Sequence, residues 1–139
     1  MGNEETARQW IDTYNDADKK RMADLMTEDS EVLIPAMGIA YGPRWERAGN
    51  AMNLVRNRTI EVRRMTASGD AVAIEFLWHA ISLGGPGLAP AGERVEMENC
   101  IVLDFRDGLV SRYVEYLGRM EGIDLAIVSR RMLESTQSS

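Results

Sequence analysis

The chain has 139 residues, of which 45% are hydrophobic and 27% are charged, and its formal net charge at pH 7 is −6. This length suits one hydrophobic core, so we expect a single domain over residues 1–139. The negative charge repels nucleic acids and anionic membrane surfaces at long range, which argues against both as partners. A lone Cys100 and a lone His79 are too few for an intrachain disulfide or a structural zinc site, and we expect neither a metal nor a cofactor.

The beginning of the chain gives no targeting signal. The segment MGNEETARQW lacks the basic-then-apolar order of a signal peptide, and no apolar run approaches the length of a membrane span. We therefore expect a cytoplasmic protein.

Two helices are predicted first. Apolar residues recur at helical spacing from Ala7 to Tyr14 and predict an amphipathic helix over residues 4–15. Asp18 can cap a second helix, because its side chain can accept a hydrogen bond from the first turn. The buried side of this second helix would consist of Met22, Leu25 and Met26.

A short strand and a third helix should follow. Residues 31–34 form an extended run that ends at Pro35. Gly42 and Pro43 should begin the helix, because proline is tolerated in a first helical turn. Its inner face would consist of Trp45, Ala48, Met52 and Val55.

From Thr59 onward the apolar residues alternate, which is typical of strands. Turn signals at residues 68–70 and 106–108 divide the region into long strands. These strands are predicted at residues 59–67, 71–82, 93–105 and 109–117. The segment LGGPGLAPAG at residues 83–92 should be a loop, and a short helix over residues 123–133 should precede a frayed polar tail.

Helices followed by a meander of strands predict an α+β fold, in which the helices cover one face of a twisted, mostly antiparallel sheet. One polar residue, Asn99, is in phase with the apolar residues of its strand. A buried amide without a partner costs about 1–3 kcal/mol, so we expect a protein group, a water or a ligand beside it. The covered face would otherwise carry Val72, Ile74, Phe76, Trp78, Ala80, Val95, Met97, Ile101, Leu103 and Phe105.

Three stretches resemble the nuclear-transport-factor-2-like superfamily, which includes ketosteroid isomerases, limonene-type epoxide hydrolases and SnoaL-like polyketide cyclases. These stretches are WIDTYNDADKKRMADLMTEDSEVLIP, AYGPRWERAGN and GERVEMENCIVLDFRDGLVSRYVEYLG. The resemblance covers roughly residues 5–120, and we assign residues 121–139 to a C-terminal helix and tail. It implies a cone-shaped α+β barrel, a curved sheet that encloses a pocket together with the helices.

The catalytic groups of two of these families are missing. The oxyanion-binding Tyr, the base and the protonated Asp of the isomerases fall on Trp10, near Ile34 and near Ile101. The Arg and Asp of the epoxide hydrolases fall on Phe76 and Trp78, which makes an epoxide hydrolase the weaker hypothesis.

The cyclases are a better match. Their acid on the last strand corresponds to Glu115, and their Gln on the preceding strand corresponds to Asn99. Their nearby His becomes Ile101, and the Asp that usually follows the aromatic pair becomes Gly118. Alternation alone leaves open which face of the last strand is buried, so an inward Glu115 is an expectation from the resemblance.

The resemblance implies a cyclase, isomerase or dehydratase that needs no cofactor and acts on a hydrophobic carbonyl compound, polyketide-like or steroid-like. Glu115 would be the base and Asn99 would assist it. The alternative is a non-catalytic module of the same fold that binds a small molecule or dimerises. We expect a homodimer that forms through the outer face of the sheet. The expected substrate-binding residues are Trp10, Tyr14, Phe76, Trp78, Met97, Ile101, Tyr113 and Leu117.

Other candidates are weaker. His79 shares the outer face of its strand with Glu75, which favours a surface or dimer-contact role. The GGPG segment lacks the helix that a dinucleotide fingerprint requires. A basic cluster is interpreted as a solvated face, although it could also steer an anionic substrate. This cluster consists of Arg56, Arg58, Arg63 and Arg64.

Overall fold

The structure, a computed structural model, describes residues 2–41 and 53–137. The helices are α1 (Asn3–Asn15), α2 (Lys19–Asp24) and α3 (Leu125–Gln137), and η1 (Pro35–Met37) is a single 3₁₀ turn. The strands are β1 (Met26–Ile34), β2 (Ile39–Tyr41), β3 (Val55–Ser68), β4 (Ala71–Ser82), β5 (Arg94–Arg106) and β6 (Leu109–Glu121).

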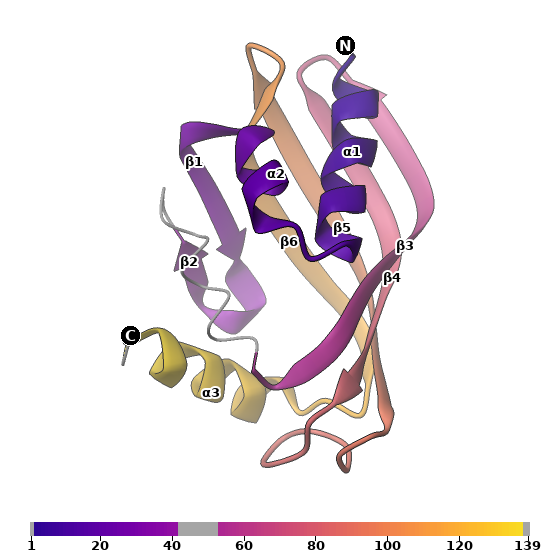
Figure 1. Cartoon of the computed structure of the whole chain (residues 1–139), viewed down its shortest axis with the longest axis vertical. Coiled ribbons are helices and arrows are strands. Elements are labelled where there is room, and N and C mark those ends of the chain that lie inside the picture. The colour runs from indigo at the N-terminus through magenta and orange to yellow at the C-terminus, as the bar shows by residue number, and fades with distance from the viewer. Residues whose placement is uncertain (1, 42–52, 138–139) are drawn as a thin grey trace.

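The strands of the described residues form one curved, mixed sheet in the order β2-β1-β6-β5-β4-β3. All neighbours are antiparallel except β1 and β6, which run parallel. Figure 1 shows α1 and α2 in front of the sheet and α3 across its lower end. This arrangement confirms the predicted α+β class and the covering of one sheet face by helices. None of the described helices is long and apolar enough to cross a membrane.

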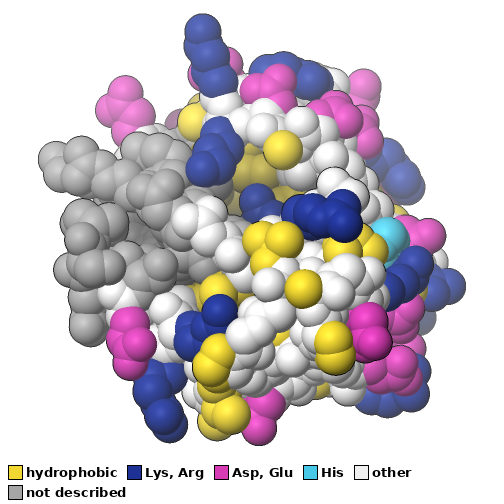
Figure 2. All heavy atoms as spheres, turned by 60° about the horizontal axis from the view of Figure 1, so that its bottom comes forward, with side chains coloured by type: hydrophobic (Ala, Val, Ile, Leu, Met, Phe, Trp, Pro, Cys, Tyr) yellow, Lys and Arg dark blue, Asp and Glu magenta, His cyan; other side chains and the backbone are white. Residues whose placement is uncertain are grey.

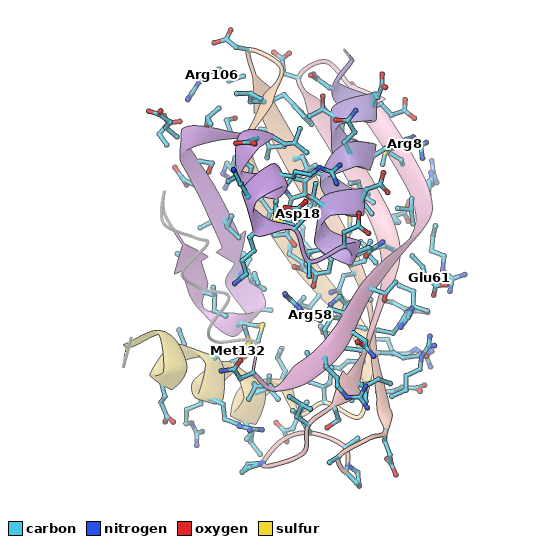
Figure 3. The ribbon with its side chains drawn as sticks, viewed as in Figure 1. Arg8, Asp18, Arg58, Glu61, Arg106 and Met132 are labelled. Carbon is cyan, nitrogen blue, oxygen red and sulfur yellow. The ribbon has the colours of Figure 1, made fainter. Side chains whose placement is uncertain are left out.

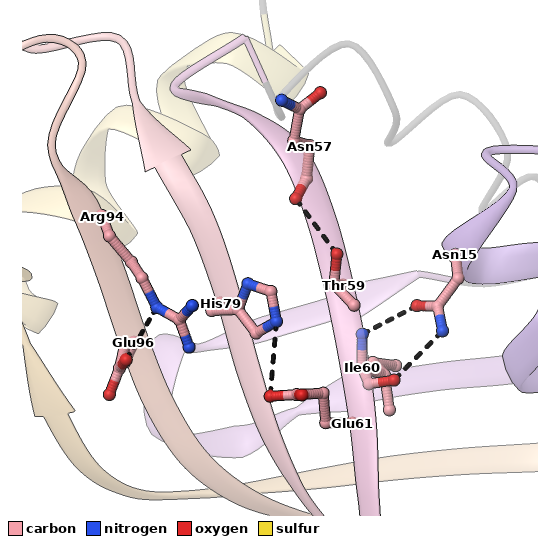
Figure 4. A network of polar contacts seen from close by, with 8 residues as sticks. All are labelled: Asn15, Asn57, Thr59, Ile60, Glu61, His79, Arg94 and Glu96. Carbon is pink, nitrogen blue, oxygen red and sulfur yellow. Dashed lines mark hydrogen bonds and ion pairs between the residues drawn. The ribbon is translucent and has the colours of Figure 1, made fainter.

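Helix α1 is attached to the edge of the sheet by its last residue. Its inner side buries Ala7, Trp10 and Ile11 against the sheet. Asn15 then bonds both backbone groups of Ile60 on the edge strand β3: its Nδ2 donates to the carbonyl at 3.0 Å, and its Oδ1 accepts from the amide at 2.7 Å (Figure 4). Because an edge strand leaves alternate backbone groups unpaired, this contact both satisfies them and fixes the end of the helix.

The second helix is capped as predicted, since the amide of Arg21 donates to Asp18 at 3.1 Å. It ends earlier than expected, however, and Met26 starts strand β1 instead of continuing the helix. The strand is also longer than the predicted residues 31–34. Its first half is the polar segment 27–31, which hides the alternation, and parallel pairing with β6 supplies the hydrogen bonds that local sequence does not reveal.

The third predicted helix falls mostly on residues 42–52, outside the described residues. The assignment of Val55 to it was wrong, because Val55 begins β3 and pairs with Ser82. Strand β2 was not predicted. Helix α3 begins at Leu125, two residues later than expected, and continues through part of the predicted polar tail; Asp124 accepts a hydrogen bond from the amide of Ile127 at 3.3 Å in its first turn.

The predicted phase of strands β4 and β5 is confirmed. Val95, Ile101, Leu103 and Phe105 are buried on β5, and Asn99 is buried among them with 6% exposure. On β4 the same face buries Val72, Ile74, Phe76, Trp78 and Ala80. The core therefore lies between the concave face of the sheet and α1.

Candidate functional site

A cavity of about 190 Å³ lies between the concave face of the sheet and the three helices. Its wall is mostly apolar, and Figure 2 shows hydrophobic side chains at the bottom of a hollow with basic side chains near its rim. Methionines come from four elements of this wall. Their flexible, polarisable side chains adapt to the shape of a bulky apolar ligand. These methionines are Met22, Met37, Met97 and Met132.

Glu115 is the buried acid of this wall. It lies on β6, is 9% exposed, and lines the cavity. Each carboxylate oxygen has its own donor: the hydroxyl of Tyr113 donates to Oε1 at 2.5 Å, and Nδ2 of Asn99 donates to Oε2 at 2.7 Å. Tyr113 is two residues away on the same strand, and Asn99 is a diagonal neighbour on β5. The carboxylate is therefore held in one orientation.

Burial raises the pKa of Glu115, and the hydrogen bonds from Tyr113 and Asn99 oppose this increase. The pKa of Tyr113 lies well above its usual value because of burial and the neighbouring Glu115 charge. The phenol therefore keeps its proton and donates a hydrogen bond to the carboxylate. A buried carboxylate that has a raised pKa and fixed donors is suited to accept a proton from a bound molecule.

Asn99 acts behind the carboxylate and does not line the cavity. Its Oδ1 accepts from the amide of Gly118 at 3.4 Å, and its other end holds Glu115. β6 has one extra residue in this region, since Asn99 pairs with Leu117 while Met97 pairs with Met120. A Cβ at position 118 would lie 2.3 Å from the carbonyl oxygen of Glu98. The family's Asp therefore has no room here unless the backbone moves.

Four aromatic side chains form the wall around Glu115. Nε1 of Trp78 donates to the hydroxyl of Tyr14 at 2.9 Å. The ring of Trp10 lies 6.0 Å from that of Tyr14 and 5.3 Å from that of Tyr113. Nε1 of Trp10 is buried and has no hydrogen-bond partner among the described residues. An indole N–H without a partner is costly, so this position favours a ligand that accepts a hydrogen bond.

Two of the predicted substrate-binding residues do not contact the cavity. Phe76 is 2% and Ile101 is 0% exposed, and both belong to the core. They face the concave side as predicted, but both lie in the hydrophobic core cluster that also contains Ala7 and Ile11 of α1. The structure does place the other predicted residues in the cavity wall: Trp10, Tyr14, Trp78, Met97, Tyr113 and Leu117.

Arg58 is the residue that sequence reasoning missed. It lies in the predicted basic cluster but lines the cavity, so the interpretation as a solvated face was wrong for this residue. Its guanidinium carbon lies 5.1 Å from the centre of the Tyr14 ring.

His79 lies outside the cavity, as the sequence predicted, and its Nε2 is 3.4 Å from a carboxylate oxygen of Glu61 (Figure 4). No group of three His, Cys, Asp or Glu side chains that could hold a metal ion occurs within residues 2–41 and 53–137.

Several solved structures share this fold. IdmH from Streptomyces antibioticus, a proposed polyketide cyclase, is 16% identical over 99% of both chains, with a TM-score of 0.75. A proposed polyketide cyclase from Xanthomonas campestris is 22% identical over 84% of this chain and 90% of its own, with a TM-score of 0.71. AclR from Streptomyces galilaeus, a proposed hydroxylase, is 17% identical over 84% of this chain and 74% of its own, with a TM-score of 0.70.

A comparison with curated protein sequences finds no match. The sequence profile of the SnoaL-like domain, in contrast, matches residues 7–113, which is more than half of the chain. The cone-like architecture, the cavity and this match agree, and the chain belongs to the SnoaL-like family.

Proposed function

We propose that the protein is a cofactor-independent enzyme that removes a proton next to the carbonyl group of a hydrophobic small molecule, with Glu115 as the general base. The observation that carries this proposal is the fixed, buried carboxylate in the wall of an apolar cavity. The names of similar folds, which include polyketide cyclases and ketosteroid isomerase-like proteins, support a carbonyl substrate.

In the proposed step, Glu115 takes a proton from the carbon next to the ketone. The electron pair of the broken C–H bond moves toward the carbonyl oxygen, so the products are a carboxylic acid and an enolate. The enolate carbon can attack a second carbonyl group of the same molecule, which closes a ring, and the alkoxide that forms takes the proton back from Glu115. Alternatively, Glu115 returns the proton at another carbon, which moves a double bond.

The enolate oxygen needs a hydrogen-bond donor, because its negative charge develops in a cavity with little water. Trp10 supplies a buried N–H without a partner among the described residues. Tyr14 supplies a hydroxyl whose oxygen already accepts from Trp78, and such a chain polarises the O–H group. Asn99 serves in this proposal as a positioning residue, because its amide donates to Glu115 and does not reach the cavity.

The test is exchange of α-protons for deuterium in a panel of aromatic and alicyclic ketones, followed by NMR in D₂O. We expect the protein to accelerate exchange for at least one ketone and Glu115→Gln to abolish the acceleration. Glu98→Gln is the matched control, since this side chain is 60% exposed on the neighbouring strand. Equal exchange by the wild type and Glu115→Gln would refute the assignment of the base.

The alternative is a non-catalytic module of the same fold that binds a small molecule or dimerises. Trp10 and Tyr113 line the cavity, and this observation favours a protein that takes up a small molecule over a module that only dimerises. The exchange experiment separates the enzyme from a module that only binds. The homodimer contact through the outer sheet face stays a prediction. Tyr116, which is 53% exposed on that face, is its most exposed large hydrophobic residue among the described residues.

A further inference from the structure

Arg58 reaches the cavity because of an irregularity in β3. Arg56 pairs with Ile81, whereas Thr59 pairs with His79, so β3 has one extra residue between these pairs. Asn57 adopts a positive φ of 56° at this point, a conformation that asparagine tolerates better than most residues.

Val55 and Arg58 are three residues apart and would lie on opposite faces of a regular strand. After the bulge both of them line the cavity. In Figure 3 the side chain of Arg58 extends from β3 toward the middle of the molecule, whereas Glu61 points outward. The phase change therefore moves a cation from the surface into an apolar wall.

No carboxylate within the described residues forms an ion pair with Arg58. Its neighbour in the cluster, Arg64, faces Glu75 at 3.6 Å. Two carboxylates line the same cavity, but each is engaged elsewhere. Asp18 caps α2 and faces Arg21 at 3.8 Å, and Glu115 is held by its two donors.

Moving a guanidinium partly out of water costs solvation free energy, and no anion of the protein offsets this cost here. A ligand with a negative charge would offset it. The contact with the face of Tyr14 stabilises the cation by only about 0.5–2 kcal/mol. The planar guanidinium matches a carboxylate, because its N–H groups can donate to both oxygens at once. Lys19, also in the wall, adds a second positive charge to the cavity.

We infer that Arg58 binds a carboxylate of the substrate, so that the molecule converted at Glu115 is a hydrophobic keto acid. The inference rests on the proposed function for the reacting ketone, but the acid-binding role of Arg58 can be tested separately. The apolar wall takes the carbon skeleton, Arg58 holds the acid group at one side, and Glu115 faces the carbon that loses its proton. Charge at Arg58 thus selects the substrate and orients it.

The experiment compares naphthylacetate with its methyl ester, which lacks the negative charge and adds one methyl group. Binding is measured by quenching of tryptophan fluorescence, since Trp10 and Trp78 line the cavity. We expect Arg58→Met to weaken binding of the acid about 10-fold or more, because it removes a hydrogen-bonded charge partner, and to change binding of the ester less than about 2-fold. Arg58→Lys should retain part of the preference for the acid.

Arg56→Met is the matched control, because Arg56 is exposed on the same strand, and it should leave both affinities unchanged. The inference is overturned if the wild type does not bind the acid or does not prefer it to the ester. It is also overturned if Arg58→Met weakens the binding of acid and ester equally, or if Arg56→Met weakens the binding of the acid as much as Arg58→Met does. Glu115→Gln should keep the preference for the acid while it abolishes proton exchange, so failure of the base and failure of the acid site are distinguishable.

Discussion

Removing the hydroxyl of Tyr113 should change the pH dependence of the proposed reaction. In Tyr113→Phe the ring remains, and with it the contact to Trp10 at 5.3 Å, but Oε1 of Glu115 loses its hydrogen bond of 2.5 Å. This bond stabilises the charged form of Glu115 more than the neutral form. Its loss therefore raises the pKa of Glu115 beyond the increase that burial already causes.

The size of the effect follows from the surroundings of the carboxylate. A hydrogen bond to a charged group contributes about 1.5–3 kcal/mol, and Glu115 is only 9% exposed, so water replaces little of the loss. Only the ionised fraction accepts a proton. At a pH below the pKa, kcat/KM should fall about 10- to 100-fold, because each 1.36 kcal/mol changes the ionised fraction tenfold. At high pH, where Glu115 is ionised in both proteins, the rates should converge.

The assay is proton exchange on the best ketone of the panel, followed from about pH 4 to about pH 9, the range in which a perturbed carboxyl titrates. We expect the acid limb of Tyr113→Phe at higher pH than that of the wild type. Tyr116→Phe, on the same strand but 53% exposed, should leave the limb in place. An acid limb that stays or moves to lower pH in Tyr113→Phe would show that Tyr113 does not stabilise the ionised base.

Three further predictions concern stability. Gly118→Ala should lower the free energy of unfolding by about 1–3 kcal/mol, because the new Cβ meets the Glu98 carbonyl; an unchanged urea midpoint would contradict this. Asn15→Ala removes both hydrogen bonds to the Ile60 backbone and should cost about 1–3 kcal/mol in the same measurement, whereas a loss within error would mean that water replaces the amide. The pKa of Glu115 is higher in the folded state than in the unfolded state. Its contribution to the free energy of unfolding is therefore fully present below the unfolded-state pKa and is lost as the pH rises through the folded-state pKa. The stability of Glu115→Gln minus that of the wild type should therefore increase with pH across this window, and a flat difference in unfolding free energy would argue against a raised pKa.

Much of the fold could be predicted because local pattern and final environment agree. The apolar spacing of α1 and the alternation of β4 and β5 both reflect the face that is buried. The position of Asn99 followed directly from that alternation. Strand β1 could not be predicted in full, because polar residues fill its first half and its pairing partner lies about eighty residues later along the chain.

The orientation of Glu115 illustrates a different difficulty. Near the turn of the hairpin Phe105 pairs with Val110, and continued without interruption this register would place Tyr116 opposite Asn99. Glu115 would then point to the outer face, since paired residues share a face. One extra residue at Ser111 shifts the register, and Ile101 pairs with Glu115 on the concave side. Alternation cannot reveal such an insertion, so the resemblance to the cyclases carried that expectation.

Three one-residue irregularities thus determine the chemistry of the cavity. The first, at Ser111, turns Glu115 inward, and the second, near Gly118, brings a backbone amide toward Asn99, which holds the carboxylate. The third, at Asn57, turns Arg58 inward. A regular sheet of the same sequence would place the acid on the outer face, and it would not put Arg58 and Val55 on the same face. A bulge re-aims every side chain beyond it at the cost of one unpaired residue. In the proposed reaction, the placement of the base and of the acid-binding arginine therefore depends on where the strands depart from regular pairing, and we expect insertions or deletions at these three points to alter proton exchange more than most substitutions in the apolar wall.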